Sequence, residues 1–349
     1  MLIERGVMPV TKAAAYFVLG AKGNEIMKVF LAGATGAIGR RLVPLLKESG
    51  HTVLGTTRSR DKARLIEDAG GQAVVVNCLD SKAVMQVVMR TRPDAIIHQL
   101  TDLTAMKNLK KFDDGFDTTS RLRIEGTQNL IDAGRAAGVR LFIAQSYTGW
   151  PNSKGGSRLK SEEDPLDAHP PKPMERSLKA ILRLESMVSS LSGMTGVVLR
   201  YGSLYGPGTS LAPGGDIFEA VRARKLPLIG GGAGIWSFTH VDDAAAATIS
   251  ALECAKPGVF NIVDNEPAEV SVWLPELARQ LGAKAPYSIP RWIGRLAVGD
   301  AGVSIMTEIR GSSNAKAKRE LGWAPMYPSW REGFCAEAST AAQLRTVHQ

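Results

Sequence analysis

Cysteine is scarce in this 349-residue chain, which has only Cys78, Cys254 and Cys335. Three cysteines so far apart exclude a disulfide framework, and no Cys/His pair has the spacing of a zinc site. The five histidines are also dispersed. We therefore expect no metal centre and a reducing, cytoplasmic setting.

The chain also lacks a long hydrophobic run and a dense basic stripe. The apolar stretch at 13–20 is too short to span a bilayer and resembles a signal peptide only faintly, so we expect no membrane association. The formal charge is +9, but Lys and Arg are scattered, and the densest cluster, 316–319, lies beside Glu320. We interpret this cluster as a solvated helix face and expect no nucleic-acid binding, although the excess charge would favour an acidic or phosphorylated ligand.

The most informative segment is 28–40, which reads KVFLAGATGAIGR. A short apolar run is followed by three glycines and then by residues with helical spacing. A turn between a strand and a helix N-terminus can bind a pyrophosphate, because glycine lets the backbone approach closely and the helix start offers free N–H groups. The alternative is an ordinary glycine turn in a βα unit. We expect a dinucleotide to contact Gly33, Thr35, Gly36, Ala37, Ile38 and Gly39.

Apolar runs alternate with helical patterns from 28 to 146. This alternation predicts an α/β fold of the Rossmann type, a doubly wound parallel sheet with helices on both faces and a small C-terminal substrate lobe. The expected strands are 29–32, 52–55, 73–76, 95–97, 141–144 and 196–200. The expected helices are 37–48, 61–69, 81–91, 119–137, 174–192 and 241–254, with a long loop at 149–173.

The same patterns suggest four parts of the chain. Residues 1–26 form an N-terminal extension, interpreted as disordered or as the product of an early start codon. Residues 27–200 form the NAD(P)-binding domain. Residues 201–335 form a mixed lobe that carries the substrate site and returns some elements to the sheet, and 336–349 form a peripheral tail.

The end of the second strand bears on the choice of cofactor. An NAD site usually has an Asp or Glu there, which binds the ribose hydroxyls. Here the strand runs into Thr56-Thr57-Arg58-Ser59-Arg60, and no carboxylate follows until Asp61. Arg58 can stack on adenine and pair with a 2′-phosphate, which favours NADP over NAD. The alternative is a pair of solvated arginines at the start of a helix.

Three further segments, with the glycine turn, resemble a known family. They read RYGSLYGPG at 200–208, SFTHVDDAA at 237–245, and SNAK and LGWAP within 313–325. Over about 27–335 the chain resembles the short-chain dehydrogenase/reductase superfamily, extended or atypical type, in the NAD-dependent epimerase/dehydratase family. The resemblance implies additional cofactor contacts at Asn77, Cys78, Leu79, Leu100, Thr101 and Ser203.

The chain departs from this family at its catalytic pair. Active members use a Tyr and a Lys four residues later, and the Lys lowers the pKa of the Tyr so that it can exchange a proton. In one register Lys179 is paired with Glu175. In the other, set by Glu185, the positions hold Ser177 and Ile181. Neither register contains the tyrosine.

Ser146 and Tyr147 are the remaining catalytic candidates, because they follow the fifth strand where the family's Ser or Thr stands. The alternative is that Ser146 only hydrogen-bonds a cofactor or loop, while Tyr147 packs against Trp150. We expect an NADP-dependent oxidoreductase or epimerase-like enzyme acting on a small carbonyl, hydroxyl or sugar-like compound. The alternative function is a non-catalytic NADP(H)-binding sensor or partner-binding protein. A homodimer through helices 119–137 and 174–192 stays open.

Overall fold

The computed structural model describes residues 25–103 and 108–347 of the chain. Apart from Glu25 and Ile26, the expected N-terminal extension at 1–26 lies outside the described residues. Among the helices of the described part, none is long and apolar enough to cross a membrane.

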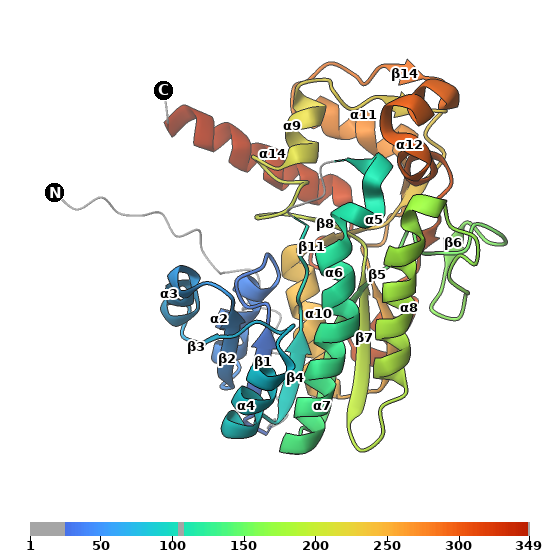
Figure 1. Cartoon of the computed structure of the whole chain (residues 1–349). Helices are drawn as coiled ribbons and strands as arrows, with labels where there is room; N and C mark the ends of the chain where they lie inside the picture. Colours follow the sequence, from blue (N-terminus) through green and yellow to red (C-terminus); the bar gives the residue numbers. More distant parts are fainter. Residues whose placement is uncertain (1–24, 104–107, 348–349) are drawn as a thin grey trace.

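A seven-stranded parallel sheet forms the centre of the molecule, in the order β12-β7-β5-β4-β1-β2-β3 (Figure 1). Helices cover both faces, which explains why most strand sequences are continuous apolar runs rather than alternating ones. This arrangement confirms the predicted fold class, and the six predicted strands lie close to their expected positions. The strands are β1 (Lys28–Ala32), β2 (Thr52–Thr57), β3 (Gln72–Val75), β4 (Ala95–His98), β5 (Leu141–Tyr147), β7 (Thr195–Tyr201) and β12 (Gly258–Ile262).

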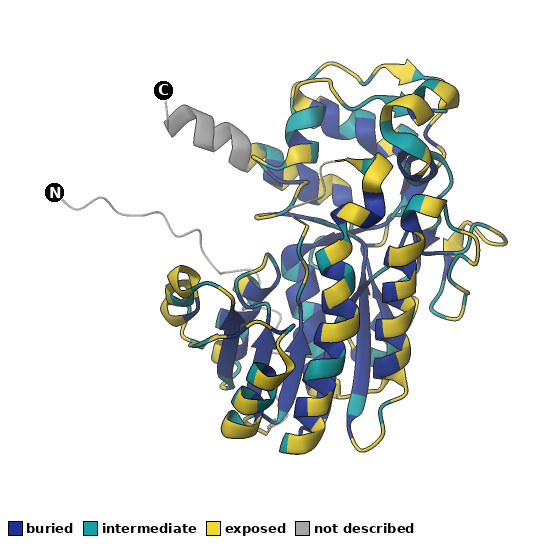
Figure 2. Ribbon diagram, viewed as in Figure 1, coloured by how far each residue is buried: buried dark blue, intermediate teal, exposed yellow. Residues whose placement is uncertain are grey.

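Two apolar cores lie on the two faces of this sheet. Along β1, Val29 and Leu31 belong to one core, whereas Phe30 and Ala32 belong to the other, because successive strand residues point to opposite faces. Helices α2, α3 and α10 pack on the first face and α4, α7 and α8 on the second, each with its buried side toward the strands (Figure 2). Their bounds are α2 (Gly39–Glu48), α3 (Ala63–Asp68), α4 (Ser81–Thr91), α7 (Thr127–Ala137), α8 (Glu175–Ser189) and α10 (Val241–Cys254).

The helix predicted at 119–137 is interrupted by one π-helical turn. It consists of α6 (Asp117–Arg121), the π turn η3 (Leu122–Gly126) and α7. A π turn widens the helix locally and is often found at functional sites. Short helices precede several of the longer ones: η1 (Arg60–Lys62), η2 (Leu109–Lys111), α5 (Phe112–Gly115) and η4 (Lys172–Met174).

A smaller lobe sits above the carboxyl ends of the strands (Figure 1). Its core contains large aromatic side chains, including Phe238, Trp273 and Trp330. The predicted loop at 149–173 contains one short strand, β6 (Leu159–Lys160), which pairs with β15 (Gly311–Ser312). The other elements of the lobe are β8 (Ser203–Tyr205), α9 (Asp216–Arg222), β9 (Leu228–Ile229), β10 (Ile235–Trp236), β11 (Phe238–His240), β13 (Ala268–Glu269), α11 (Val270–Gln280), β14 (Ser288–Ile289), α12 (Arg291–Thr307) and α14 (Trp330–Val347). Helix α13 (Ala315–Leu321) instead packs on the sheet, against β12 and α10.

The chain crosses between the two parts more than once. After β7 it enters the lobe, and β12 then returns to pair with β7 at the edge of the sheet. The boundary proposed between 335 and 336 falls inside α14, whose Phe334 is buried in the core of the lobe. The ion pair between Arg41 on α2 and Asp242 on α10, at 3.0 Å, joins two helices on the same face of the sheet.

Candidate functional site

The glycine turn lies at the carboxyl end of β1, where ligands bind in open parallel sheets. Gly33 has φ +96°, and a Cβ there would lie 2.7 Å from the carbonyl oxygen of Gln99. A Cβ at Gly39 would collide with the carbonyl oxygen of Gly33, whereas one at Gly36 would lie 3.4 Å from that atom. Gly33 and Gly39 are therefore required by the turn itself, while the exposed Gly36 leaves space for a ligand.

Thr56 fixes this turn from the neighbouring strand, and the sequence did not indicate it. The N–H of Gly33 donates a 3.1 Å hydrogen bond to Oγ1 of Thr56. Thr56 is buried at the end of β2, so the bond links the first two strands at the point where a dinucleotide would lie. The register of β1 and β2 is what brings these two residues together.

The other residues expected at the turn differ in what they can offer a ligand. Ile38 is only 4% exposed and packs in the core, so its side chain is not available to a ligand. Thr35 and Ala37 are half-buried, and the carbonyl of Thr35 accepts a 3.1 Å bond from Nε of Arg40. Gly208 of the lobe approaches the turn, since a Cβ on it would lie 3.6 Å from that of Ala37.

Arg58 follows β2 and lies on the protein surface, where it forms an ion pair. Its guanidinium donates to Asp102 at 3.0 Å, and the Asp102 side chain is much less exposed than that of Arg58. Asp102 itself is held through its backbone by Thr119, at 2.7 and 2.9 Å. The residues after β2 and β4 are thus joined at the edge where the adenosine half of a dinucleotide binds.

The remaining expected cofactor contacts lie after β3 and β4. Asn77 is exposed and its side chain accepts from the N–H of Leu79 at 3.1 Å, while Cys78 is buried. Burial raises the pKa of the Cys78 thiol to about 12, so this thiol is un-ionised. Thr101 is exposed, and the N–H of Leu100 donates to Nδ1 of His98 at 3.2 Å.

Ser146 is buried and its hydroxyl is already in use. It donates a 2.7 Å hydrogen bond to Glu185 of α8. The same carboxylate accepts two bonds from Arg200 of β7, at 2.8 and 2.7 Å. Both carboxylate oxygens are therefore occupied, and the three side chains lock β5, α8 and β7 together beneath the site.

Tyr147 lies at the end of β5 and faces the lobe. Its phenol oxygen lies 3.1 Å from the hydroxyl of Ser203, which follows β7. Its ring also stacks on Trp150, with the ring centres 6.3 Å apart. Burial raises the pKa of Tyr147, while the nearby charge of Arg123 opposes that effect. At neutral pH the phenol keeps its proton and can donate it.

The orientation of α8 shows which of the two sequence registers for the catalytic pair faces the interior of the protein. Glu175 and Lys179 are exposed, so that register faces solvent. Ser177 and Ile181 face the interior with Glu185, and the Ser177 hydroxyl donates to Asp113 at 2.6 Å. Neither register brings a tyrosine and a lysine together.

Arg123, in the π turn, is a residue that sequence reasoning missed. Its side chain is buried, yet its guanidinium forms no hydrogen bond with any described residue, and Nη1 is wholly enclosed. Its charge lowers the pKa of Tyr147 and of His98, and the Glu185 carboxylate raises the pKa of Arg123, so these groups lie within electrostatic range of it. A π turn and a fully buried arginine leave no clear signal in a helical sequence pattern.

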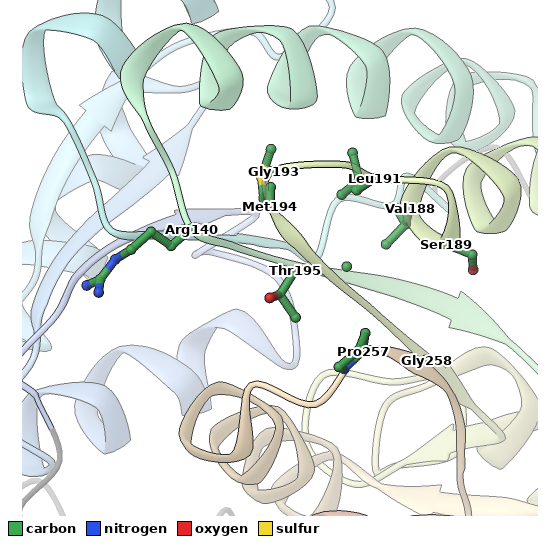
Figure 3. A pocket seen from close by; sticks show the side chains of 10 residues that line it. Arg140, Val188, Ser189, Leu191, Gly193, Met194, Thr195, Pro257 and Gly258 are labelled. Atoms are coloured by element: carbon green, nitrogen blue, oxygen red, sulfur yellow. The ribbon is translucent and has the colours of Figure 1, made fainter.

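Two open cavities lie away from the glycine turn and from Tyr147, although Leu79 lines the second of them. One, of about 570 Å³, lies at the amino ends of β5, β7 and β12 and is lined by Arg140, Met194 and Thr195 among others (Figure 3). Parallel strands put their amino ends at the sheet edge opposite the glycine turn. The other, of about 440 Å³, is lined by residues of α4, α7 and α8 and of the π turn. Over 25–103 and 108–347, we find no cluster of three His, Cys, Asp or Glu side chains that could hold a metal ion.

Comparison with known proteins places this geometry in a family. A family model described as the NAD dependent epimerase/dehydratase family matches residues 29–263. A 3-diazoavenalumate denitrifying reductase of a Streptomyces species is 40% identical over 312 residues, covering 89% of this chain and all of the relative. A 2-alkyl-3-oxoalkanoate reductase of Stenotrophomonas maltophilia is 26% identical over 269 residues, covering 74% and 76%. Both names describe reductases, and neither favours the non-catalytic alternative.

Solved structures share the fold at lower identity. The UDP-glucose 4-epimerase of Thermotoga maritima, solved with UDP-glucose, superposes with a TM-score of 0.71 at 22% identity, covering 93% of this chain and all of that one. The UDP-glucose 4-epimerase of Thermus thermophilus, solved with NAD, gives 0.69 at 24% identity, covering 90% and 98%. These likenesses concern the fold alone.

Proposed function

The chain belongs to the NAD-dependent epimerase/dehydratase family, and we propose that it is an NADP(H)-dependent reductase of a small carbonyl compound. The observation that carries the proposal is the arrangement at one sheet edge. The glycine turn after β1 provides a dinucleotide cradle, and the Tyr147 phenol stands at the end of β5 beside Ser203. A hydride donor and a proton donor would then meet over the carboxyl ends of the strands.

The names of the two reductases support this reaction class. A 2-alkyl-3-oxoalkanoate is a ketone that also carries a carboxylate, and its reductase aligns with three quarters of this chain. The denitrifying reductase, which aligns along its whole length, is named for a diazo substrate. Both are reductions, so reduction is favoured over epimerisation for this chain.

The preference for NADP rests on Arg58. No carboxylate stands at the end of β2 to bind the ribose hydroxyls, and Arg58 is held at that edge by Asp102. A guanidinium binds a phosphate through two parallel hydrogen bonds, whereas NAD offers it no phosphate at that position. NADP is therefore the proposed cofactor and NAD the weaker one.

The cofactor would be held by the residues already described. The turn Gly33–Gly39 would bind the pyrophosphate and Arg58 the 2′-phosphate, while Asn77 to Leu79, Leu100, Thr101 and Ser203 would line the adenine, ribose and nicotinamide. When bound, the reduced cofactor supplies a hydride to the carbonyl carbon. That chemistry still requires the protein to provide one proton.

Tyr147 is the proposed proton donor. Its O–H would hydrogen-bond the carbonyl oxygen and transfer its proton as the C=O double bond becomes a C–O single bond, which yields the alcohol. Ser203 orients the phenol and can relay a replacement proton from water. Ser146 acts one step away, because its bond to Glu185 fixes the end of β5 that carries Tyr147.

The test begins with binding and continues to turnover. NADPH and NADH fluorescence titrations would give both dissociation constants, and NADPH oxidation would then be followed with ketones, aldehydes and 3-oxo acids. We expect tighter NADPH binding and turnover of at least one carbonyl class. NADPH binding without any turnover across the panel would contradict a reductase and favour the sensor.

We also propose a reducing, cytoplasmic setting and a homodimer. All three cysteines are free thiols, and Cys254 and Cys335 are exposed, which suits a reducing compartment. Ile124 and Leu182, in the π turn and α8, are exposed apolar residues on the helices that would pair. Sedimentation of the wild type against Leu182→Glu would test the dimer, which should dissociate in the variant.

A further inference from the structure

Arg123 is a buried arginine whose positive charge has no hydrogen-bonded partner among the described residues. Its side chain is 5% exposed and forms no hydrogen bond with any described residue, although a guanidinium carries five N–H donors. Burying a cation without a partner is costly, and buried polar groups in proteins nearly always have one. Such a group needs an explanation beyond packing.

The carboxylate of Glu185, which acts on Arg123 electrostatically, is not available to pair with it. Glu185 accepts two bonds from Arg200 and one from Ser146, so its oxygens are already committed. Two buried arginines therefore face one buried carboxylate. The surplus positive charge is permanent, because a guanidinium does not lose its proton at neutral pH.

The position of Arg123 links this surplus charge to the proposed reaction. The π turn that carries it packs against α8, and its charge acts on the Tyr147 phenol. Tyr147 in turn contacts Ser203 from the segment after β7. Arg123 thus lies on a turn packed against α8, within electrostatic range of the proposed proton donor.

A ligand with a permanent negative charge fits this site better than a ligand that becomes charged only during the reaction. A neutral carbonyl acquires negative charge only during the reaction, and would leave Arg123 unpaired in the resting complex. A carboxylate neutralises the charge for as long as it is bound, and it matches the planar fork of the guanidinium with two parallel hydrogen bonds. The formal charge of +9 would also attract an anionic ligand to the protein.

We propose that Arg123 binds the carboxylate of the substrate beside Tyr147, so that the substrate is an acid carrying the reducible group close to its carboxylate. This inference rests on the proposed reductase function and names its substrate class. Arg123 is a substrate-binding residue, and it would hold the reducible group in reach of the phenol. Its unpaired state in the free protein is the cost of that binding.

The first test measures the free protein by calorimetry, without cofactor or turnover. Arg123→Met removes an unpaired buried charge, so we expect the melting temperature to rise by roughly 2 °C or more. Arg200→Met is the matched control: it removes a paired buried arginine and strands Glu185, so the melting temperature should fall. A fall for Arg123→Met as well would assign Arg123 a structural role and overturn the proposal.

The second test uses formate, the smallest carboxylate, as the probe. At equal ionic strength, sodium formate should raise the melting temperature of the wild type more than sodium chloride does. Arg123→Lys should keep part of this effect and Arg123→Met should lose it. Equal stabilisation by formate in the wild type and in Arg123→Met, or equal effects of chloride and formate, would overturn the assignment.

The third test addresses the substrate class on the NADP-loaded protein. Acetoacetate is the acidic probe and methyl acetoacetate its neutral match. We expect acetoacetate to bind the wild type better, with its affinity reduced about 30-fold or more in Arg123→Met and that of the ester unchanged. Equal affinities of acid and ester in the wild type would overturn the inference. None of these readouts requires turnover, so failure of the reductase proposal would be seen separately, in the NADPH oxidation assay.

Discussion

The Ser146 hydroxyl donates a 2.7 Å hydrogen bond to Glu185, which lies 39 positions later in the chain. Glu185 in turn binds the buried guanidinium of Arg200 through both of its oxygens. Ser146 therefore supports an ion pair beneath the site and has no free proton for a substrate. Tyr147, its neighbour in β5, faces the other way and bears the phenol that we propose as the proton donor.

Breaking the buried ion pair should cost much stability. Glu185→Ala leaves Arg200 buried without its partner, and we expect the free energy of unfolding to fall by about 3–5 kcal/mol in urea titrations. Replacing both residues by apolar ones, as in Glu185→Leu with Arg200→Met, should restore most of that loss. A loss below about 1 kcal/mol for Glu185→Ala would contradict the view that this pair holds the strands together.

Substitutions of Tyr147 and of Ser146 should have different effects on kcat. Tyr147→Phe removes the proton donor, so we expect kcat to fall about 100-fold or more while the dissociation constant for NADPH is unchanged. Ser146→Ala should lower kcat less than tenfold and should lower stability instead. If Ser146→Ala abolishes turnover in a folded protein and Tyr147→Phe does not, the roles are reversed.

Two glycines of the turn should respond differently to the same added methyl group. Gly39→Ala places a Cβ against the carbonyl oxygen of Gly33, so we expect a destabilised protein that does not bind NADPH. Gly36→Ala has room for its Cβ, so it should fold with an unchanged melting temperature and still bind NADPH at least tenfold more weakly. Calorimetry and fluorescence titration check both variants. Normal NADPH binding by Gly36→Ala would show that the turn is not the pyrophosphate site.

Arg58 should determine the choice between the two cofactors. Arg58→Ala should weaken NADPH binding by about 10–100-fold and leave NADH binding nearly unchanged, because only NADPH offers a 2′-phosphate. Lys62→Ala removes an equal charge nearby and is the control for general electrostatic attraction. Equal losses in both variants, or equal losses for both cofactors, would show that Arg58 does not recognise the phosphate.

His98 should make the fold sensitive to mild acid. Burial lowers the pKa of His98 to about 4, so the native state holds it neutral, whereas in the unfolded chain it takes up a proton below about pH 6.5. Stability from this group is therefore complete above pH 6.5 and is lost as the pH falls toward 4. We expect a loss of about 2 kcal/mol between pH 7 and 5, and a smaller one in His98→Gln. An identical pH dependence of the two proteins in urea titrations would contradict this.

The fold could be predicted well because its signals are local. Each buried parallel strand appears as a short apolar run, and the turn at 33–39 is recognisable from its glycines, of which Gly33 and Gly39 leave no space for a Cβ. The expected helices at 81–91 and 241–254 match α4 and α10 residue for residue. Periodicity and turn chemistry were sufficient for these elements.

The chemistry of the site could not be read in the same way, because it depends on contacts across the chain. Nothing in the local sequence around Ser146 or around Glu185 indicates that the two residues interact. They become partners only because α8 packs on β5. The orientation of α8 also decided that Lys179 faces solvent, a point that two sequence registers left open. Arg123 was missed because the π turn shifts it off the ordinary helical spacing.

The return of β12 to the sheet has a consequence for how the protein can be made. β7 pairs with residues 258–262, which are synthesised well after the dinucleotide-binding half is otherwise complete. A fragment ending near 200 would expose the edge of β7 as a template for aggregation. The cofactor half therefore cannot complete its sheet until the chain has been synthesised through residue 262.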